Sequence, residues 1–525
     1  ADYRRCIQGC GFEVQVVALA QLYDQFSYGV ETHPLSIRNF GHYIDKVIDN
    51  PRYVFLIGKG REYVGVRREA DKNSEADLPL LIPTFGAPGS DAYLMSDGRD
   101  PVPRIPIGRL AANNGREVDI YLRKVKAFEA NVNLPQTIED RAWMKRLIHL
   151  GGGGPREQAT IRRNLEGMED IIETNLFGGD VTGFYKSSSD PVQISTSEQI
   201  FDLINSGVSI ITFFGHSGAN TFDFNIDNPD NYKNKNKYPL MLSLGCHIGN
   251  IHTHFQGVSE RFTFDEDAGA IGFGASSSLG FVFSLNRFTQ DYYSLLGGEM
   301  YGSSIGDIQK ETVARLAPTA GNGMRELLQQ FSFHADPALR MNPAPGPDYV
   351  VDASTIRFEP EVITSQLDSF KVRFDILNIG KGIQDSMFVE VRQQFPDRSE
   401  TVVFYQKILA PASRSSLELW VPGSGRKSTG LNKLLITIDE NNNIEELPAL
   451  AAEDNNELTA ADGSKGICFY VIDNAVIPVA PRNFSIVNQA NPTLIASTSS
   501  SIFTEQRFVL EFAAITGSAA LLYEH

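Results

Sequence analysis

Cysteine is scarce in this chain, which has only four in 525 residues: Cys6, Cys10, Cys246 and Cys468. That number is too small for the disulfide framework on which many small secreted domains depend. Cys6 and Cys10 lie close together in the sequence, and they either form a disulfide or remain two thiols near the N-terminus. The cysteine content therefore does not identify the cellular compartment.

Long apolar runs and an excess of positive charge are also lacking. No run reaches the roughly 18 apolar residues that a membrane-spanning helix needs. Asp and Glu, 64 in all, outnumber the 47 Lys and Arg and give a net charge of −17. Such a surface repels the phosphates of nucleic acids. We therefore expect neither a membrane span nor a nucleic-acid partner.

The chain begins Ala1-Asp2-Tyr3, without methionine and without a signal peptide. We expect that an export signal preceded residue 1 and has been removed. A length of 525 residues exceeds the usual size of one domain, about 100 to 200 residues. The sequence therefore predicts two or three domains.

Two apolar runs each lead into a glycine-flanked reactive side chain. Residues 208–214 precede Gly215-His216-Ser217-Gly218, and residues 239–244 precede Gly245-Cys246. Continuous apolar runs are typical of central strands in a parallel sheet covered on both faces, whose sites lie at the carboxyl ends of the strands. We therefore predict that His216 and Cys246 share one edge of such a sheet.

A thiol next to an imidazole is an arrangement suited to nucleophilic catalysis, because the base raises the thiolate population. A single buried cysteine is more often a small core residue, and a single histidine is more often structural. His216 and Cys246 stand 30 residues apart at matching strand ends, which favours catalysis. The small residues 268–278 would then form a wall of the pocket, with Ser276 and Ser277 contacting substrate.

These motifs resemble the gingipain family of cysteine peptidases, which have a caspase-like sheet. The resemblance covers roughly residues 10–342. Besides the two strand ends and the Ala-Ile-Gly-Phe-Gly-Ala-Ser run, it rests on four shorter segments, residues 22–29, 90–93, 105–110 and 335–340. It differs from the usual pattern in reading Gly-His-Ser rather than Gly-His-Gly, and in placing His247 directly after Cys246.

The resemblance implies a fold and a set of roles. The fold class is α/β, with a caspase/gingipain-like three-layer parallel-sheet catalytic unit over residues 1–342, divided into a first α/β subdomain (about 1–140) and a catalytic subdomain (141–342). Cys246 would attack the scissile carbonyl and His216 would transfer the proton. The amides of Gly215 or Cys246 would form the oxyanion hole.

Three acidic residues have predicted roles at this site. An acidic residue in the comparable gingipain loop orients the histidine, and Glu157 is our candidate for it; the alternative is a first-turn glutamate that complements the helix dipole. Gingipains select basic residues with an acid in the S1 pocket. Asp223 and Asp227, just past His216, are the nearest candidates for that acid.

Other segments are assigned from their patterns. Residues 12–19 and 53–60 are predicted strands around a helix at 35–45, forming a βαβ unit. Gly58-Lys59-Gly60 lacks the spacing of a phosphate-binding loop, so we expect no nucleotide and no other cofactor. A structural calcium ion could bind among the side chains of Ser90, Asp91, Asp97 and Asp100, although aspartates that form turns are the simpler interpretation.

Beyond a linker at residues 341–352, the pattern changes to short alternating strands. Residues 355–470 predict an immunoglobulin-like β-sandwich, and residues 471–525 predict part of a further β module. Within the gingipain family, a peptidase unit followed by such a sandwich is most similar to the PorU-type sortases of type IX secretion.

The functional prediction is a secreted or outer-membrane-associated cysteine endopeptidase that cleaves exported proteins, with protein or peptide substrates and secretion-system components as partners. One alternative is a catalytically silent gingipain-like binding scaffold of the secretion machinery. Another is a transpeptidase, in which an amine replaces water in deacylation.

Overall fold

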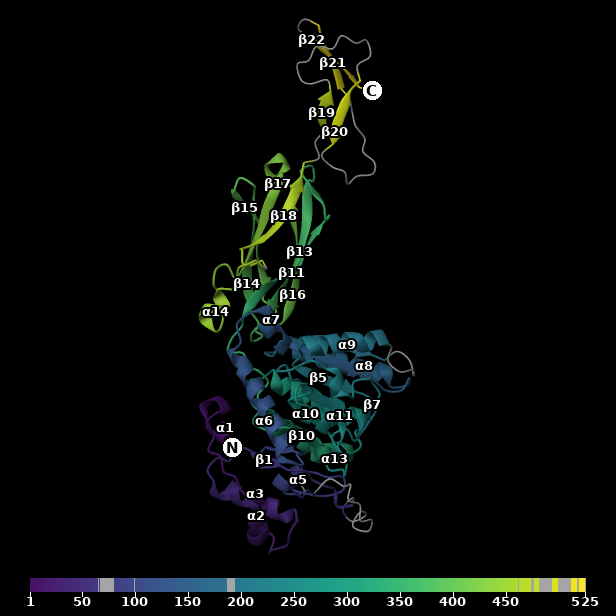
Figure 1. The fold of residues 1–525 in the computed structure, drawn as a ribbon, viewed down its shortest axis with the longest axis vertical. Coiled ribbons are helices and arrows are strands. Elements are labelled where there is room, and N and C mark those ends of the chain that lie inside the picture. The colour runs from purple at the N-terminus through teal and green to yellow at the C-terminus, as the bar shows by residue number, and fades with distance from the viewer. Residues whose placement is uncertain are drawn as a thin grey trace.

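The computed structural model describes residues 1–64, 66, 80–98, 100–186, 194–460, 462–473, 476–480, 493–498, 511–516 and 519–524. Figure 1 shows an elongated molecule in which an α/β unit, a β-sandwich and two short hairpins follow one another along the long axis. The N-terminus lies beside the α/β unit, and the C-terminus lies at the opposite end.

An eight-stranded sheet forms the centre of the α/β unit, in the order β1-β2-β10-β9-β8-β5-β3-β4. All neighbouring pairs are parallel except β9 and β10, which are antiparallel. The strands are β1 (Val54–Ile57), β2 (Ile107–Leu110), β3 (Arg146–Gly151), β4 (Asp180–Tyr185), β5 (Ile210–Phe214), β8 (Leu240–Leu244), β9 (Gly272–Ser276) and β10 (Phe331–His334).

Helices cover both faces of this sheet, because alternate residues of each buried strand point to opposite sides. Ile210 belongs to the core cluster that contains residues of α8 (Gln158–Thr174), α11 (Val282–Leu296) and α12 (Ile305–Leu316). Its neighbour Ile211 packs with residues of α9 (Ile194–Ser206) and α10 (Val258–Phe264). The predicted three-layer architecture is confirmed, with one antiparallel strand pair added to the parallel sheet.

Of the remaining helices, α6 and α13 also contribute residues to the core cluster that contains Ile210. These helices are α1 (Asp2–Arg5), α2 (Leu19–Phe26), α3 (Leu35–Val47), α5 (Ala92–Met95), α6 (Gly115–Ala130), α7 (Ile138–Arg141), α13 (Asn322–Gln330) and α14 (Ala449–Glu453). The long α6 begins with a capping side chain, since Asn114 accepts a hydrogen bond from the Glu117 amide. The predicted helix at 35–45 is confirmed by α3.

The predicted strand at residues 12–19 is wrong, and so is the βαβ unit built on it. Residues 11–18 have no regular structure, and α2 begins at Leu19. Val16 is 76% exposed, so its apolar neighbours do not form a buried strand. The segment instead lies against the N-terminus, where the Arg5 guanidinium donates to the carbonyl of Val14.

The predicted β-sandwich follows, and its first strand starts at Tyr349, earlier than the expected residue 355. One sheet has the order β11-β13-β16 and the other β12-β18-β17-β14-β15. Burial alternates along the strands, as in a half-buried sheet, so Met387, Val389 and Val391 of β14 face the core. The strands are β11 (Tyr349–Glu359), β12 (Ile363–Thr364), β13 (Ser369–Asn378), β14 (Ser386–Gln394), β15 (Glu400–Leu409), β16 (Arg414–Pro422), β17 (Gly430–Ile438) and β18 (Ile467–Ile472).

Direct contacts join the sandwich to the α/β unit. The buried ammonium of Lys145, just before β3, donates to the carbonyls of Gly380 at 2.6 Å and Ala412 at 2.9 Å. The Gly382 amide donates to the carbonyl of Leu176. The linker predicted at residues 341–352 is therefore part of a packed junction, in which Asp348 is fully buried.

Two hairpins lie beyond the sandwich, formed by β19 (Val476–Ala480) with β20 (Ile495–Thr498) and by β21 (Glu511–Thr516) with β22 (Ala519–Glu524). Among the residues that the structure describes, no helix is long and apolar enough to cross a membrane. All four cysteines are free, so Cys6 and Cys10 do not form a disulfide.

Candidate active site

His216 and Cys246 follow the ends of two hydrogen-bonded parallel strands. Phe214, the last residue of β5, pairs with Leu244, the last residue of β8, and each reactive side chain comes two residues later. This confirms the predicted placement at one sheet edge. The expectation followed from strand type alone, because parallel neighbours end at the same edge.

The two strand ends are closely packed against each other. A Cβ atom at Gly245 would lie 2.1 Å from the Ser217 hydroxyl oxygen, so only glycine fits at this position. The same hydroxyl donates to the carbonyl of Cys246 at 2.9 Å. Ser217, at the position where the motif departs from Gly-His-Gly, thus fixes the histidine turn to the cysteine turn.

Glu157 contacts the histidine, as predicted. Its Oε2 lies 2.8 Å from Nε2 of His216 and also accepts the Gly154 amide at 3.1 Å. Glu157 immediately precedes α8, so the loop after β3 delivers the carboxylate to the sheet edge. The pair is solvent-accessible, with the His216 side chain 65% exposed and the Glu157 side chain 42% exposed.

The Cys246 thiol is half-buried and accepts a hydrogen bond from the amide of Gly280, at 3.4 Å from N to Sγ. The sulfur therefore lies next to the backbone of Gly280 and remains partly accessible to solvent. Among the described contacts, the imidazole of His216 bonds Glu157 and makes no hydrogen bond to the thiol. Such catalytic bonds often form only when substrate binds.

The two predicted oxyanion-hole amides differ in availability. The Gly215 amide donates to the carbonyl of Leu244 at 3.4 Å, within the strand pair. No backbone hydrogen bond in the described part of the chain uses the amide of Cys246. Cys246 therefore has the amide that is better placed to receive a developing oxyanion.

His247, the second histidine of this motif, lies on a turn beyond the strand rather than on the strand itself. Strand β8 ends at Leu244, and His247 has a φ of 60°, in the left-handed region. Its amide donates to the carbonyl of Ser278 at 2.8 Å. The turn therefore determines where the His247 side chain lies. The alternation of side chains between the two faces of a strand does not apply to it.

Comparison with known proteins identifies the family of this chain. The model of Peptidase family C25 matches residues 1–342, well over half of the chain. The chain belongs to peptidase family C25. This is the gingipain family, so the resemblance found in the sequence is confirmed.

Solved structures of similar fold include members of family C25. The arginine-specific gingipain R (RgpB) is 13% identical, with 76% of this chain and 84% of that chain covered and a TM-score of 0.47. The complex of Porphyromonas gingivalis RgpB pro- and mature domains covers 86% and 92%, at 13% identity and a TM-score of 0.48. Dimeric latent PorU from the same organism is 13% identical, with 92% and 42% covered and a TM-score of 0.33. A search of curated proteins finds no match.

The other predicted site residues lie at different depths in this C25 fold. Asp223 is half-buried below the histidine turn, where its Oδ2 accepts the Gly153 amide at 2.7 Å. Asp227 lines a separate hollow of about 540 Å³ with Arg261. Ser276 and Ser277 are fully buried, and the Ser277 hydroxyl donates to the carbonyl of Gly89. The structure brings Asp223 next to the dyad and places the two serines beneath the surface.

The side chains of the four candidate calcium ligands do not converge on one site. Asp91 forms a buried two-pronged ion pair with Arg109, with both N–O distances 2.7 Å. Asp97 binds Arg104, and the Asp100 carboxylate accepts the amide of Val102. The Ser90 hydroxyl donates to the carbonyl of Gln329. Within the described residues, no three His, Cys, Asp or Glu side chains could hold a metal ion.

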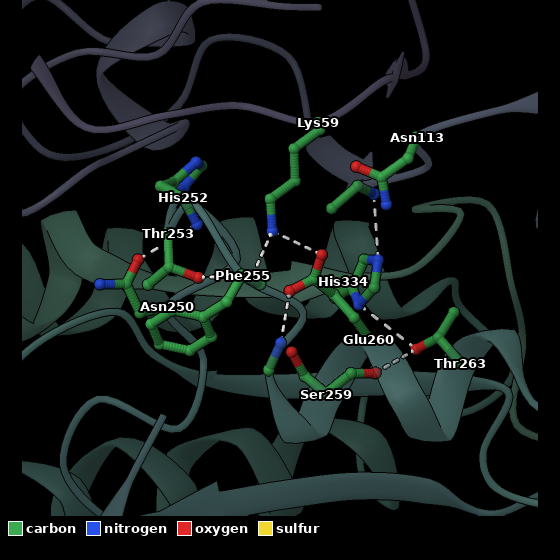
Figure 2. A network of polar contacts seen from close by, with 12 residues as sticks. Lys59, Asn113, Asn250, His252, Thr253, Phe255, Ser259, Glu260, Thr263 and His334 are labelled. Carbon is green, nitrogen blue, oxygen red and sulfur yellow. Dashed lines mark hydrogen bonds and ion pairs between the residues drawn. The ribbon is translucent and has the colours of Figure 1, made fainter. Parts of the chain in front are cut away.

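Sequence reasoning missed a buried ion pair between Lys59 and Glu260 (Figure 2). The Lys59 ammonium is 2.5 Å from Glu260 Oε1, and both side chains are fully buried. Lys59 also donates to the carbonyl of Phe255, and Glu260 Oε2 accepts the Gly257 amide at 2.9 Å. Burial lowers the pKa of Lys59 and raises the pKa of Glu260 to about 7.

This pair connects β1 to the segment that follows the nucleophile. Lys59 comes just after β1, whereas Phe255 and Gly257 end the loop that starts at Cys246. Asn250 of that loop is held in turn by Glu62, whose Oε1 accepts its side-chain amide at 3.0 Å. The Gly58-Lys59-Gly60 motif was visible in the sequence, but its partner 201 residues away was not.

Proposed function

We propose that this chain is a cysteine endopeptidase that cleaves peptide bonds in exported proteins through Cys246 and His216. One observation supports the proposal most directly: the two side chains follow the carboxyl ends of adjacent strands β5 and β8. Membership of family C25 supports peptidase chemistry at this position.

The mechanism follows from the contacts of each group. Because Nε2 of His216 faces Glu157, Nδ1 is the nitrogen left to take the thiol proton. The Cys246 thiolate attacks the carbonyl carbon of the peptide bond, and the Cys246 amide stabilises the oxyanion. Collapse of this intermediate breaks the C–N bond, and the departing amine takes the proton from His216. A thioester between Cys246 and the acyl fragment remains.

Deacylation needs a second nucleophile. Water attacks the thioester while His216 accepts its proton, which releases the acid product and restores the thiol. An amine in place of water would give transpeptidation, the sortase-like outcome. The order of a peptidase unit followed by a β-sandwich supports a PorU-type role in type IX secretion, at the cell surface and in contact with other secretion components. The −17 net charge is consistent with protein rather than nucleic-acid partners.

The test is covalent labelling with a library of peptidyl chloromethyl ketones, in which the thiolate displaces chloride. We expect mass spectrometry to find the adduct on Cys246 and to find none in Cys246→Ala. Product masses after peptide cleavage, with and without an added amine, separate hydrolysis from transfer. A folded protein that no peptidyl probe labels would instead support the binding scaffold.

A further inference from the structure

Three large apolar side chains are exposed in the stretch of chain around Gly280, whose amide contacts the Cys246 thiol. Leu279 is 50% exposed, Phe281 50% and Phe283 78%. They belong to residues 279–283, here called the 279–283 segment, which runs from the loop after β9 into the first turn of α11. Single exposed apolar residues are common, but a continuous exposed group marks a binding surface.

The backbone of this segment is held in place from several sides. The Gln330 side chain donates to the carbonyl of Leu279 at 2.6 Å, and the Leu285 amide donates to that of Phe281 at 2.9 Å. The Phe281 ring also packs against Gly323, where an added Cβ would lie 3.2 Å from it. The side chains therefore face solvent from a fixed backbone rather than from a loose loop.

The segment is also in direct contact with the reacting atom. Its central residue, Gly280, donates its amide to Cys246 Sγ at 3.4 Å. The preceding residue, Ser278, accepts the amide of His247 from the cysteine turn. A peptide whose carbonyl carbon reaches Sγ therefore lies next to Gly280, which stands between Leu279 and Phe281 in the chain.

We propose that the 279–283 segment is a substrate-binding surface that receives nonpolar side chains flanking the scissile bond. The occupant is an extended peptide of a protein substrate, because the surface is continuous with the nucleophile. Removing apolar area from water contributes about 25 cal/mol per Å², so a leucine or phenylalanine side chain gains most from this contact. This inference rests on the proposed peptidase function and adds a substrate class to it.

A preference for basic residues would need a carboxylate turned toward the substrate. Two acidic side chains lie near the dyad: Glu157 bonds the ring of His216, and Asp223 accepts the Gly153 amide with Oδ2 at 2.7 Å. The three exposed large side chains of the 279–283 segment are all apolar. The surface therefore favours nonpolar over charged side chains next to the cleaved bond.

The experiment measures the second-order rate constant for labelling of Cys246 by three tripeptidyl chloromethyl ketones that end in Phe, Lys or Asp. Iodoacetamide, which has no side chain, reports on the thiol itself. The variants are Phe283→Ser, which removes the most exposed ring, and Phe283→Leu, which keeps an apolar side chain. Leu450→Ser is the matched control, because Leu450 is 86% exposed on α14 of the sandwich region.

We expect the wild type to react fastest with the Phe probe. Phe283→Ser should lower that rate constant by about tenfold, while Phe283→Leu and Leu450→Ser stay within about twofold of the wild type. Iodoacetamide should react equally with all four proteins. Equal or faster labelling by the Lys or Asp probe would overturn the apolar preference alone. The apolar preference would also be overturned if Phe283→Ser lowered the rate constant for iodoacetamide as much as that for the Phe probe. A wild type that reacts with none of the peptidyl probes would overturn the peptidase proposal itself.

Discussion

Among the described residues, the imidazole of His216 bonds one carboxylate, that of Glu157, and Nδ1 remains for the thiol. His216→Ala should therefore lower kcat/KM by a factor of roughly 10² to 10⁴, the range for loss of a positioned general base. Steady-state cleavage of a quenched peptide measures this effect. An unchanged urea-unfolding midpoint should show that the fold persists.

His247 provides the matched control for that substitution. It lies on a left-handed turn next to the nucleophile, and its backbone amide, rather than its ring, holds the turn through Ser278. We expect His247→Ala to change kcat/KM by less than about threefold, because the backbone contact is kept. If His247→Ala abolished peptide cleavage while His216→Ala left kcat/KM unchanged, the assignment of the catalytic histidine would be reversed.

In the proposed mechanism, Glu157 acts only through the histidine, as a positioning residue. Both side chains are solvent-accessible, so their contact contributes about 1 kcal/mol or less, as exposed ion pairs do. Glu157→Gln should lower kcat by about fivefold with little change in KM, because an amide oxygen can still accept the ring N–H. Glu157→Ala should lower kcat more than Glu157→Gln does. If both variants had the same kcat as the wild type, the role of Glu157 would be limited to stabilising the N-terminus of α8.

At the scale of elements, the buried pair of Lys59 and Glu260 ties β1 to α10 and to the end of the cysteine loop. Removing one buried partner leaves the other charge buried and unpaired. This lowers the free energy of unfolding by about 3–5 kcal/mol. Urea unfolding should show that loss for Lys59→Met. The double variant Lys59→Met/Glu260→Met should recover most of it, since no isolated charge remains. Additive losses in the double variant would mean that the two side chains do not stabilise each other.

The same elements show what the sequence could and could not predict. The strand ends at Phe214 and Leu244 were predictable, because continuous apolar runs followed by glycine have few other interpretations. The failure at residues 12–19 has the same origin: an apolar pattern shows that a segment could form a strand, not that a neighbouring strand exists to bond it. Lys59 and Glu260 were not predictable, since their pairing depends on how distant layers meet.

For the whole molecule, Glu446 makes stability depend on pH. It is fully buried near the start of the sandwich, where its Oε2 accepts the Tyr349 amide at 2.5 Å. Burial raises the pKa of Glu446 from its ordinary value of 4.5 to about 8. Between these values the folded state keeps a proton that the unfolded state has released, so stability falls as pH rises through this window.

Glu446→Gln should remove that contribution while keeping an oxygen for the Tyr349 amide. In urea unfolding, the variant and the wild type should have similar stability near pH 5. The variant should become the more stable one as pH approaches 8, by up to about 1.4 kcal/mol for each pH unit. Parallel stability curves for the two proteins from pH 5 to 8 would contradict this origin.

Domain order was predictable from the change in strand pattern near residue 350, but domain contact was not. The linker has the proline and glycine content of a flexible connection, yet Lys145 fixes the two units through the carbonyls of Gly380 and Ala412. Both acceptors are backbone carbonyls. Every residue has one, so no residue type in the sequence indicates this contact. The rigid junction therefore emerged only from the structure.

The half-buried thiol of Cys246 has a consequence for how the enzyme responds to oxidants. A sulfur that solvent can reach, with a backbone N–H directed at it, is open to peroxide, which converts such a thiol first to a sulfenic acid and then, irreversibly, to a sulfinic acid. The first product loses the nucleophile but returns to the thiol with a reductant. If Cys246 is the nucleophile, the redox state of the surroundings would thus set the active fraction of this protein, independently of how much substrate is present.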